Sequence, residues 1–237
     1  MDLGKEFIKY ASKDKGMSRM HLEKYIESTS VPNIHGFTPQ VIEERQMNIV
    51  GMDVFSRLMM DRIIFLGVPI NDYVANVIQA QLLFLESTDA SRDVQMFINS
   101  PGGSVIPGLG IYDTMQYIAP EVSTICTGLA ASMGAVLLTA GAKGKRTALH
   151  HSRVMIHQPM GGMEGQVSDM EISYNLIKEL QTELYEILVI HTGKNFETIK
   201  RDCDRDKWMK ADEALEYGLV DEVIKINRDQ TTKSTKS

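Results

Sequence analysis

An α/β fold, with helices packed on a β-sheet, is the architecture that this sequence predicts. Segments typical of strands alternate with segments typical of helices, which is the pattern of βαβ units. The chain has 237 residues, enough for one domain with a sizeable core and short for two. Hydrophobic residues make up 43% and charged residues 24%, as in ordinary soluble globular proteins.

Three pairs of a strand and a helix follow one another in the chain. Each strand is a short apolar run, and the helices show apolar residues three or four positions apart. The predicted elements are a strand at 62–67, a helix at 73–85, a strand at 94–98, a helix at 104–118, a strand at 122–127 and a helix at 130–140. Turns are expected at the Asn-Ser-Pro-Gly-Gly segment 99–103 and at Gly128.

A longer helix is predicted over residues 168–191. Ser168 and Glu171 form a capping-box pattern at its start, and Gly193 is suited to end it. Its apolar residues are too many for one stripe, so the helix has two faces to bury. Two interpretations stay open: a core helix, or a helix that also buries surface against another subunit.

The two ends of the chain differ in character from its middle. Residues 1–38 are polar and weakly periodic, and we interpret them as an N-terminal extension or pro-segment. Residues 39–226 form the predicted domain, and the polar residues 227–237 are a predicted disordered tail.

Charge and composition argue against several classes of protein. The net charge of -6 argues against a nucleic-acid-binding protein, which usually has a basic face. The apolar run around Ser132 is interrupted by polar residues and is shorter than the roughly 20 residues of a membrane-spanning helix. The first thirty residues lack the apolar core of a secretory signal. Cys126 and Cys203 have no metal-binding spacing and are expected to be reduced thiols of a cytoplasmic protein.

Ser132 is the candidate nucleophile. It follows a predicted strand and lies in the first turn of a predicted helix, where unpaired amides and the positive end of the helix dipole are found. Small residues surround it, so a substrate backbone can approach and the amide of Met133 can face a developing oxyanion. The stretch resembles the nucleophile elbow G-x-S-x-G, although Ala130 replaces the first glycine. A helix-capping serine is the structural alternative.

A serine hydroxyl needs a base to take its proton, and His157 is the candidate. It lies at the end of a predicted strand, before an irregular segment rich in proline and glycine. The other histidines fall in the polar extension, at a turn or near a helix end: His21, His35, His150, His151 and His191. For the carboxylate that orients the imidazole, the charged run 201–208 offers Asp202, Asp204 and Asp206, and its residues alone leave the choice open.

The turn at 99–103 is rich in backbone amides and is suited to hold a phosphate or an oxyanion. The phosphate-binding pattern G-x-x-x-x-G-K-[ST] occurs nowhere in the chain. We therefore expect no nucleotide-hydrolysing site in this chain.

Four segments, occurring in this order, resemble the ClpP family, the proteolytic subunits of the Clp protease. They are Phe-Ile-Asn-Ser-Pro-Gly-Gly at 97–103, Gly-Leu-Ala-Ala-Ser-Met-Gly-Ala at 128–135, Ser-Arg-Val-Met-Ile-His-Gln-Pro at 152–159 and Arg-Asp-Cys-Asp-Arg-Asp at 201–206. The likeness covers about residues 54–223. It implies a crotonase-like α/β fold of repeated ββα units, with a protruding long helix for ring–ring contact.

The resemblance also implies an activity and the residues that carry it. The chain would be a serine endopeptidase with Ser132 as nucleophile, His157 as general base and Asp206 as the orienting carboxylate. The amides of Gly103 and Met133 would form the oxyanion hole. No metal and no cofactor is implied, because a partner ATPase, not this chain, would use ATP.

Assembly and partners are implied in the same way. The family forms two stacked heptameric rings, joined here by residues 168–191, and receives unfolded protein substrates from Clp-type AAA+ ATPase chaperones. Asp204 and Arg205 would contribute to the ring contact, Tyr117 to ATPase docking and residues 42–48 to the axial loops.

Two other functions are compatible with parts of the sequence. A crotonase-like acyl-CoA enzyme would use the amides of the Pro-Gly-Gly turn, but no pair of glutamates is placed for its acid–base chemistry. A non-enzymatic subunit that only builds the chamber would be expected to have a broken triad, and all three residues are present.

Overall fold

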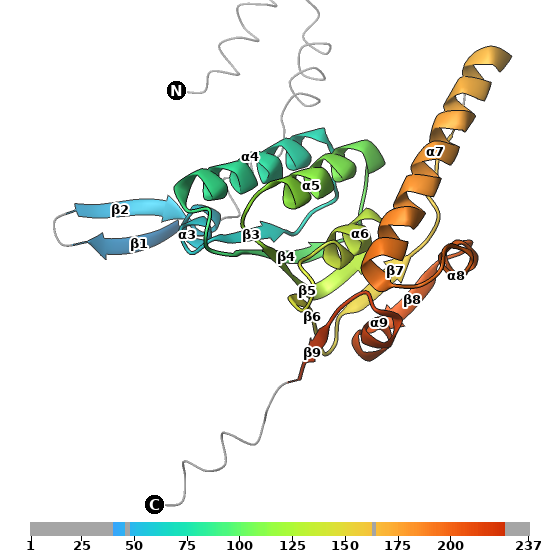
Figure 1. Ribbon diagram of the computed structural model, residues 1–237. Coiled ribbons are helices and arrows are strands. Elements are labelled where there is room, and N and C mark those ends of the chain that lie inside the picture. Colours follow the sequence, from blue (N-terminus) through green and yellow to red (C-terminus); the bar gives the residue numbers. More distant parts are fainter. Residues whose placement is uncertain (1–39, 46–47, 163–164, 226–237) are drawn as a thin grey trace, which may run out of the picture. The chain divides into compact units, whose positions relative to one another are not determined.

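The structure, a computed structural model, describes residues 40–45, 48–162 and 165–225 (Figure 1). It divides into two units, Met1–Val54 and Phe55–Ser237. In the first unit, β1 (Gln40–Arg45) and β2 (Asn48–Asp53) pair antiparallel. The predicted extension 1–38, the tail 227–237, His21 and His35 lie outside the described residues.

The second unit is built on a mixed sheet with seven strands among the described residues. Neighbouring strands follow the order β3-β4-β5-β6-β9, while β7 pairs with β5 and with β8. The strands are β3 (Ile63–Leu66), β4 (Val94–Ser100), β5 (Val122–Ala131), β6 (Arg146–Leu149), β7 (Arg153–Ile156), β8 (Lys207–Lys210) and β9 (Glu222–Ile224). The pairings are parallel except for the antiparallel pair of β7 and β8. The predicted α/β class is confirmed.

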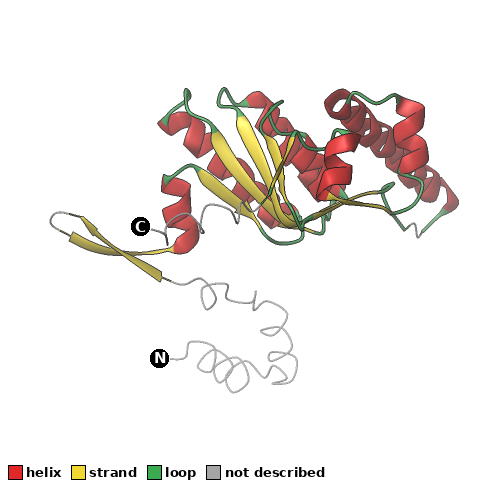
Figure 2. Ribbon diagram, turned by 90° about the horizontal axis from the view of Figure 1, so that it is seen from below, coloured by secondary structure: helices red, strands yellow, loops and turns green. Residues whose placement is uncertain are grey.

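Helices separate most of these strands in the chain and pack on the sheet (Figure 2). The helices are α3 (Val54–Met60), α4 (Asp72–Thr88), α5 (Val105–Tyr117), α6 (Met133–Thr139), α7 (Val167–Thr192), α8 (Phe196–Asp202) and α9 (Ala211–Tyr217). Figure 1 shows α4 and α5 side by side over one face of β3 and β4. The residues of β4 alternate accordingly: Val94, Met96 and Ile98 are buried, and Gln95 between them is exposed.

Two predictions around Gly128 are wrong. No turn occurs there, because β5 continues through Gly128 to Ala131, and the helix predicted at 130–140 begins at Met133. The glycine lies where β5 changes partners, pairing with β6 before it and with β7 after it. At this point the side-chain oxygen of Asn99 accepts a hydrogen bond from the Leu129 amide at 3.0 Å. A Cβ at Gly128 would come within 2.6 Å of that oxygen, which explains a glycine inside a strand.

The long helix α7 is confirmed, with a different start. Its N-cap is Gln166, so Ser168 lies inside the helix and the predicted capping box is wrong. Its C-terminus is as predicted, since Gly193 adopts the left-handed conformation with φ 71° and donates to the Val189 carbonyl at 3.0 Å.

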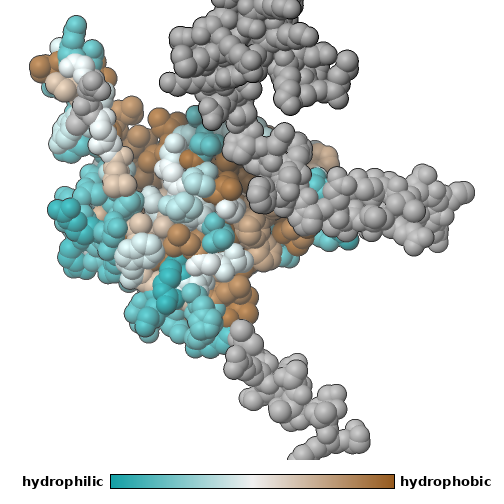
Figure 3. Space-filling view, turned by 180° about the vertical axis from the view of Figure 1, so that it is seen from behind, coloured by the Kyte–Doolittle hydropathy of each residue, from teal (hydrophilic) through white to brown (hydrophobic). Residues whose placement is uncertain are grey.

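The two halves of α7 have different surroundings. Its buried residues all lie in the C-terminal half: Leu184, Tyr185, Ile187 and Leu188. The N-terminal half projects from the sheet and exposes Ile172 by 68% and Leu176 by 47% (Figure 1). Seen from behind, this end carries hydrophobic as well as hydrophilic side chains (Figure 3). The core-helix interpretation is therefore wrong for the projecting half. Within the described residues, no helix combines the length and hydropathy needed to cross a bilayer.

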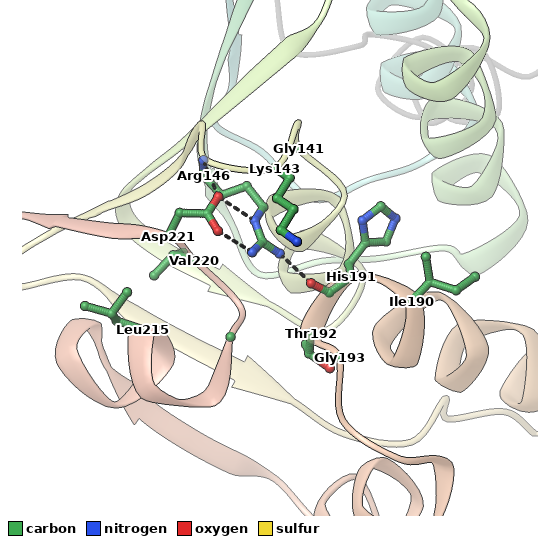
Figure 4. Close-up of a pocket in the computed structure, with 11 residues that line it drawn as sticks. Gly141, Lys143, Arg146, Ile190, His191, Thr192, Gly193, Leu215, Val220 and Asp221 are labelled. Carbon is green, nitrogen blue, oxygen red and sulfur yellow. Dashed lines mark hydrogen bonds and ion pairs between the residues drawn. The ribbon is translucent and has the colours of Figure 1, made fainter.

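A buried ion pair joins the end of α7 to the sheet. Arg146, at the start of β6, is 5% exposed and binds Asp221 through Nη2 at 2.5 Å and through Nε at 2.8 Å. Its Nη1 also donates to the carbonyl of His191, near the C-terminus of α7, at 2.9 Å. Figure 4 shows these contacts at the edge of a hollow of about 440 Å³. Arg146 thus connects β6, the end of α7 and the segment that leads into β9.

The charge of Asp221 is stabilised in the fold. Partial burial raises the pKa of its carboxyl, but hydrogen bonds from Arg146 and the Gly144 amide outweigh this effect, and the pKa lies below its ordinary value. Such a group stabilises the folded state above its unfolded pKa of about 3.9, and this stabilisation is lost as the pH falls through the lower folded pKa.

We expect Asp221→Asn to lower the free energy of unfolding at pH 7 by about 3 kcal/mol, because it leaves the buried Arg146 guanidinium without an opposite charge. The deficit should be smaller at pH 3, which lies below the unfolded pKa of about 3.9, because the native carboxylate contributes less to stability there. Urea unfolding at both pH values measures the difference. Asp212→Asn is the matched control, since Asp212 is 52% exposed in its pair with Lys225 and should change stability by less than about 1 kcal/mol. An equal deficit at both pH values would contradict the prediction.

Candidate active site

Ser132 lies in the sharp turn between β5 and α6. Its backbone has φ 54° and ψ -124°, a region that residues with side chains rarely adopt, at a cost of about 1–3 kcal/mol. Its amide donates to the Met155 carbonyl at 2.8 Å, which ties the turn to β7. A strained strand-to-helix turn of this kind projects the serine hydroxyl out of the sheet, as in a nucleophile elbow. The side chain makes no capping hydrogen bond, so the helix-capping alternative is wrong.

His157 is brought to Ser132 by the pairing of β5 with β7. These strands are parallel, and Ala131, the last residue of β5, is paired with Met155. Both chains therefore leave the sheet at the same end, and the Nε2 atom of His157 lies 2.8 Å from the Oγ atom of Ser132. The imidazole is sheltered, with a side chain 10% exposed.

Asp206 is brought to His157 by the antiparallel pairing of β7 with β8. Ile156 is paired with Lys207, so the residues just beyond them, His157 and Asp206, meet at the same end. The Nδ1 atom of His157 lies 3.1 Å from the Oδ1 atom of Asp206. The other two aspartates of the run have different surroundings, because Asp202 binds Lys207 and Tyr217 and Asp204 is 72% exposed.

The oxyanion donors expected from the sequence are the backbone amides of Gly103 and Met133. Met133 is the first residue of α6, so its N–H has no partner within the helix. Gly103 forms an isolated bridge with Ile70, in which Ile70 binds the Gly102 carbonyl and the Ser104 amide. The N–H of Gly103 therefore points away from Ile70.

Gly102, which the sequence analysis did not single out, packs directly against the nucleophile. Its φ is 90°, and a Cβ there would lie 2.8 Å from the Cβ of Ser132 and 2.9 Å from the Met133 amide. The residue must therefore be glycine for both conformation and space. Its place in the Pro-Gly-Gly turn is the signal that was available in the sequence.

A small hollow adjoins the serine and the histidine. It has a volume of about 20 Å³, and its lining is mostly apolar: Val105, Ser132, Met133, Val136, Ile156, His157, Pro159, Leu184, Tyr185 and Leu188. The C-terminal half of α7 thus forms one wall of the site. At this volume the hollow has room only for a small group.

Gln158 is a further residue that the sequence analysis passed over. Its amide donates to the Cys203 carbonyl at 2.6 Å, and its side chain donates to the Asp204 carbonyl at 2.8 Å. These bonds attach the segment before Asp206 to the residue after His157. The signal in the sequence was its position directly after the candidate base.

The other chemically active side chains lie in different surroundings. His150 and His151 are exposed at a turn, as expected, and His191 binds the Tyr112 hydroxyl at 3.2 Å. Both cysteines are free and buried; burial raises the pKa of both thiols, that of Cys203 to about 12. Neither cysteine is suited to act as a nucleophile. Among the described residues, no three histidine, cysteine or acidic side chains are grouped as a metal site.

The chain is similar to known proteases over most of its length. The Clp protease family model matches residues 45–227. The ATP-dependent Clp protease proteolytic subunit of Porphyromonas gingivalis is 58% identical over 225 residues, which is 94% of this chain and 99% of the relative. The protein of the same name from Bacteroides fragilis is 59% identical over 220 residues, which is 92% of this chain and 98% of the relative. The acyl-CoA and non-enzymatic alternatives are therefore not retained. The chain belongs to the Clp protease family, as a proteolytic subunit and a serine endopeptidase that needs no cofactor of its own.

Proposed function

We propose that this chain hydrolyses peptide bonds through an acyl-enzyme on Ser132, with His157 as general base and Asp206 as the carboxylate that orients it. The observation that carries the proposal is the continuous contact from Ser132 Oγ to His157 Nε2, at 2.8 Å, and from His157 Nδ1 to Asp206 Oδ1, at 3.1 Å. Both distances allow hydrogen bonds, so the hydroxyl proton has an acceptor and the ring is held in one tautomer.

In the first step, Ser132 Oγ attacks the carbonyl carbon of the scissile bond while His157 Nε2 takes its proton. Nδ1–H donates to Asp206, whose negative charge stabilises the imidazolium that forms. His157 then gives the proton to the leaving amine. In the second step, a water molecule loses a proton to His157 and attacks the acyl-enzyme. His157 returns this proton to Ser132 Oγ as the bond to the acyl group breaks and the carboxylic acid is released.

The oxyanion of each tetrahedral intermediate would be stabilised by the amides of Gly103 and Met133. Both donors belong to the backbone, so they are already oriented before the reaction begins and need no reorganisation. The positive end of α6 points to the same place, although this helix is short.

The hollow beside Ser132 suggests the kind of side chain that is accepted next to the scissile bond. Its apolar lining and its volume of about 20 Å³ favour a small apolar side chain, since a charged side chain would lose its hydration there without a partner. The substrates would be polypeptides in an extended conformation.

The exposed half of α7 supports an oligomeric assembly. It carries four large apolar side chains on the surface: Val167, Ile172, Tyr174 and Leu176. Surface of this kind on a helix is typical of a protein–protein contact. We propose that α7 joins two heptameric rings of this chain, with Asp204 and Arg205 nearby, and that the active sites face the enclosed chamber.

The names of the relatives describe a proteolytic subunit of an ATP-dependent protease. We therefore propose that a Clp-type AAA+ ATPase unfolds substrates and delivers them to this chain in the cytoplasm. Tyr117, 79% exposed at the end of α5, is a candidate for the docking surface. Residues 42–48, between and within β1 and β2, are candidates for the axial loops.

Ser132→Ala should abolish peptide hydrolysis, because loss of a triad serine lowers kcat by about 10⁶. A fluorogenic peptide measures the rate, and a fluorophosphonate probe with mass mapping identifies the labelled residue. Ser87→Ala, at an exposed serine of α4, is the matched control and should keep both activity and labelling. Labelling that persists in Ser132→Ala would contradict the assignment.

Gly102→Ala should reduce kcat by about 10²–10³, the usual effect of a lost oxyanion donor, because its Cβ would displace Ser132 and the Met133 amide. Gly144→Ala is the matched control: its φ of 82° is also positive, but a Cβ there would meet nothing within 4 Å. Steady-state peptide hydrolysis separates the two variants. Equal losses in both would indicate a general effect of backbone strain.

The double variant Ile172→Asp/Leu176→Asp should halve the assembled mass, because two charges on α7 would oppose contact between rings. Light scattering measures the mass, and circular dichroism checks the fold, which should persist because both side chains are exposed in the single chain. Ile172→Val/Leu176→Met keeps the surface apolar and should keep the native mass. An unchanged mass in the aspartate variant would argue against a ring contact through α7.

A further inference from the structure

The carboxylate of Asp206 lies in a short connection that does little by itself to hold it. This connection runs from Cys203 to Asp206, between the end of α8 and the start of β8. The Asp206 side chain is 59% exposed, so burial does not fix its rotamer. Its contact with His157 is useful for catalysis only if the ends of the connection are themselves held.

Asp202, at the end of α8, holds both ends of this connection. Its side chain is 11% exposed, and its Oδ2 atom accepts from the Lys207 ammonium at 2.9 Å. Lys207 directly follows Asp206 and opens β8. The ion pair therefore closes the base of the connection, with Asp206 as the last residue inside it.

A third element fixes the ion pair in place. The hydroxyl of Tyr217, at the end of α9, donates to the same Oδ2 atom at 3.0 Å, and Tyr217 is 8% exposed. The Lys207 ammonium also lies 5.0 Å from the centre of the Tyr217 ring. Arg201 Nε donates to the other oxygen, Oδ1, at 3.1 Å. The carboxylate of Asp202 is thus bound on both of its oxygens.

The charges in this cluster are consistent with these roles. Burial raises the pKa of Asp202, but hydrogen bonds from Lys207, Tyr217 and Arg201 outweigh it, and the pKa lies below its ordinary value. Burial, followed by the hydrogen bond to Asp202, raises the pKa of Tyr217. The tyrosine therefore remains a donor and the aspartate an acceptor at neutral pH.

We propose that Asp202, bound to Lys207 and Tyr217, is a positioning residue that holds the Asp206 carboxylate against His157. It touches neither the substrate nor the reacting atoms and acts through Asp206. The proposal rests on the triad proposed above. It also separates the roles of two nearby aspartates that look equivalent in the charged run.

The test is a double-mutant cycle of Asp202→Asn and Asp206→Asn in the full chain. Asp202→Asn keeps the shape of the side chain and removes its charge. We expect it to lower kcat for a fluorogenic peptide by about 10- to 100-fold, as for a small misplacement of a catalytic group, with little change in KM. In the Asp206→Asn background it should change the rate of Ser132 labelling by a fluorophosphonate less than about 2-fold, because the group it positions is already lost.

Each outcome of the cycle has a distinct meaning. The positioning role would be overturned if Asp202→Asn kept native kcat. It would also be overturned if Asp202→Asn lowered the rate of Ser132 labelling by the same factor with and without Asp206→Asn. Full activity in Asp206→Asn would instead overturn the proposed triad. Asp212→Asn, which alters an exposed aspartate–lysine pair, is the matched control and should keep native kcat.

A milder variant covers the case in which Asp202→Asn fails to fold or assemble. Tyr217→Phe removes one hydroxyl from the cluster and leaves the ion pair of Asp202 with Lys207 intact. It should lower kcat by a smaller factor in the same direction, again with little effect in the Asp206→Asn background. A Tyr217→Phe variant with native kcat would count against the proposal.

Discussion

The pairing of β7 with β5 on one side and with β8 on the other is the constraint on which the site depends. Through it, the ends of three strands lie next to one another, and each contributes one member of the Ser132–His157–Asp206 arrangement. Because side chains alternate along a strand, a shift of one residue in either register would turn His157 to the opposite face. The short β7 therefore decides whether the site exists.

The strained turn at Ser132 is stable because its surroundings leave it little freedom. Its amide is bound to the Met155 carbonyl, and its carbonyl accepts from Ala135 and Val136 in the first turn of α6. All seven residues of α6 are buried. A positive φ persists where packing over-determines the backbone in this way, and here it directs a hydroxyl towards the imidazole.

The long helix α7 connects the site to the surface of the subunit. Leu184, Tyr185 and Leu188 of its C-terminal half line the hollow beside Ser132, while its N-terminal half is exposed. One rigid element therefore reaches from the wall of the site to the surface proposed to join the rings. Arg146 donates to the His191 carbonyl near the C-terminus of α7. The position of this helix relative to the sheet is therefore fixed by a buried charge.

The sequence by itself determined the α/β class, the approximate positions of the first three strands and four longest predicted helices of the main unit, and the candidates Ser132 and His157. These features depend on local patterns: apolar periodicity, small residues around a serine, and a histidine at the end of an apolar run. Tertiary structure decided which aspartate contacts His157, where β5 ends, and what Asp202 and Arg146 bind. Ser132 and His157 are 25 residues apart in the chain, and His157 and Asp206 are 49 apart. Contacts over such separations follow from strand register and packing, which short-range preferences do not encode.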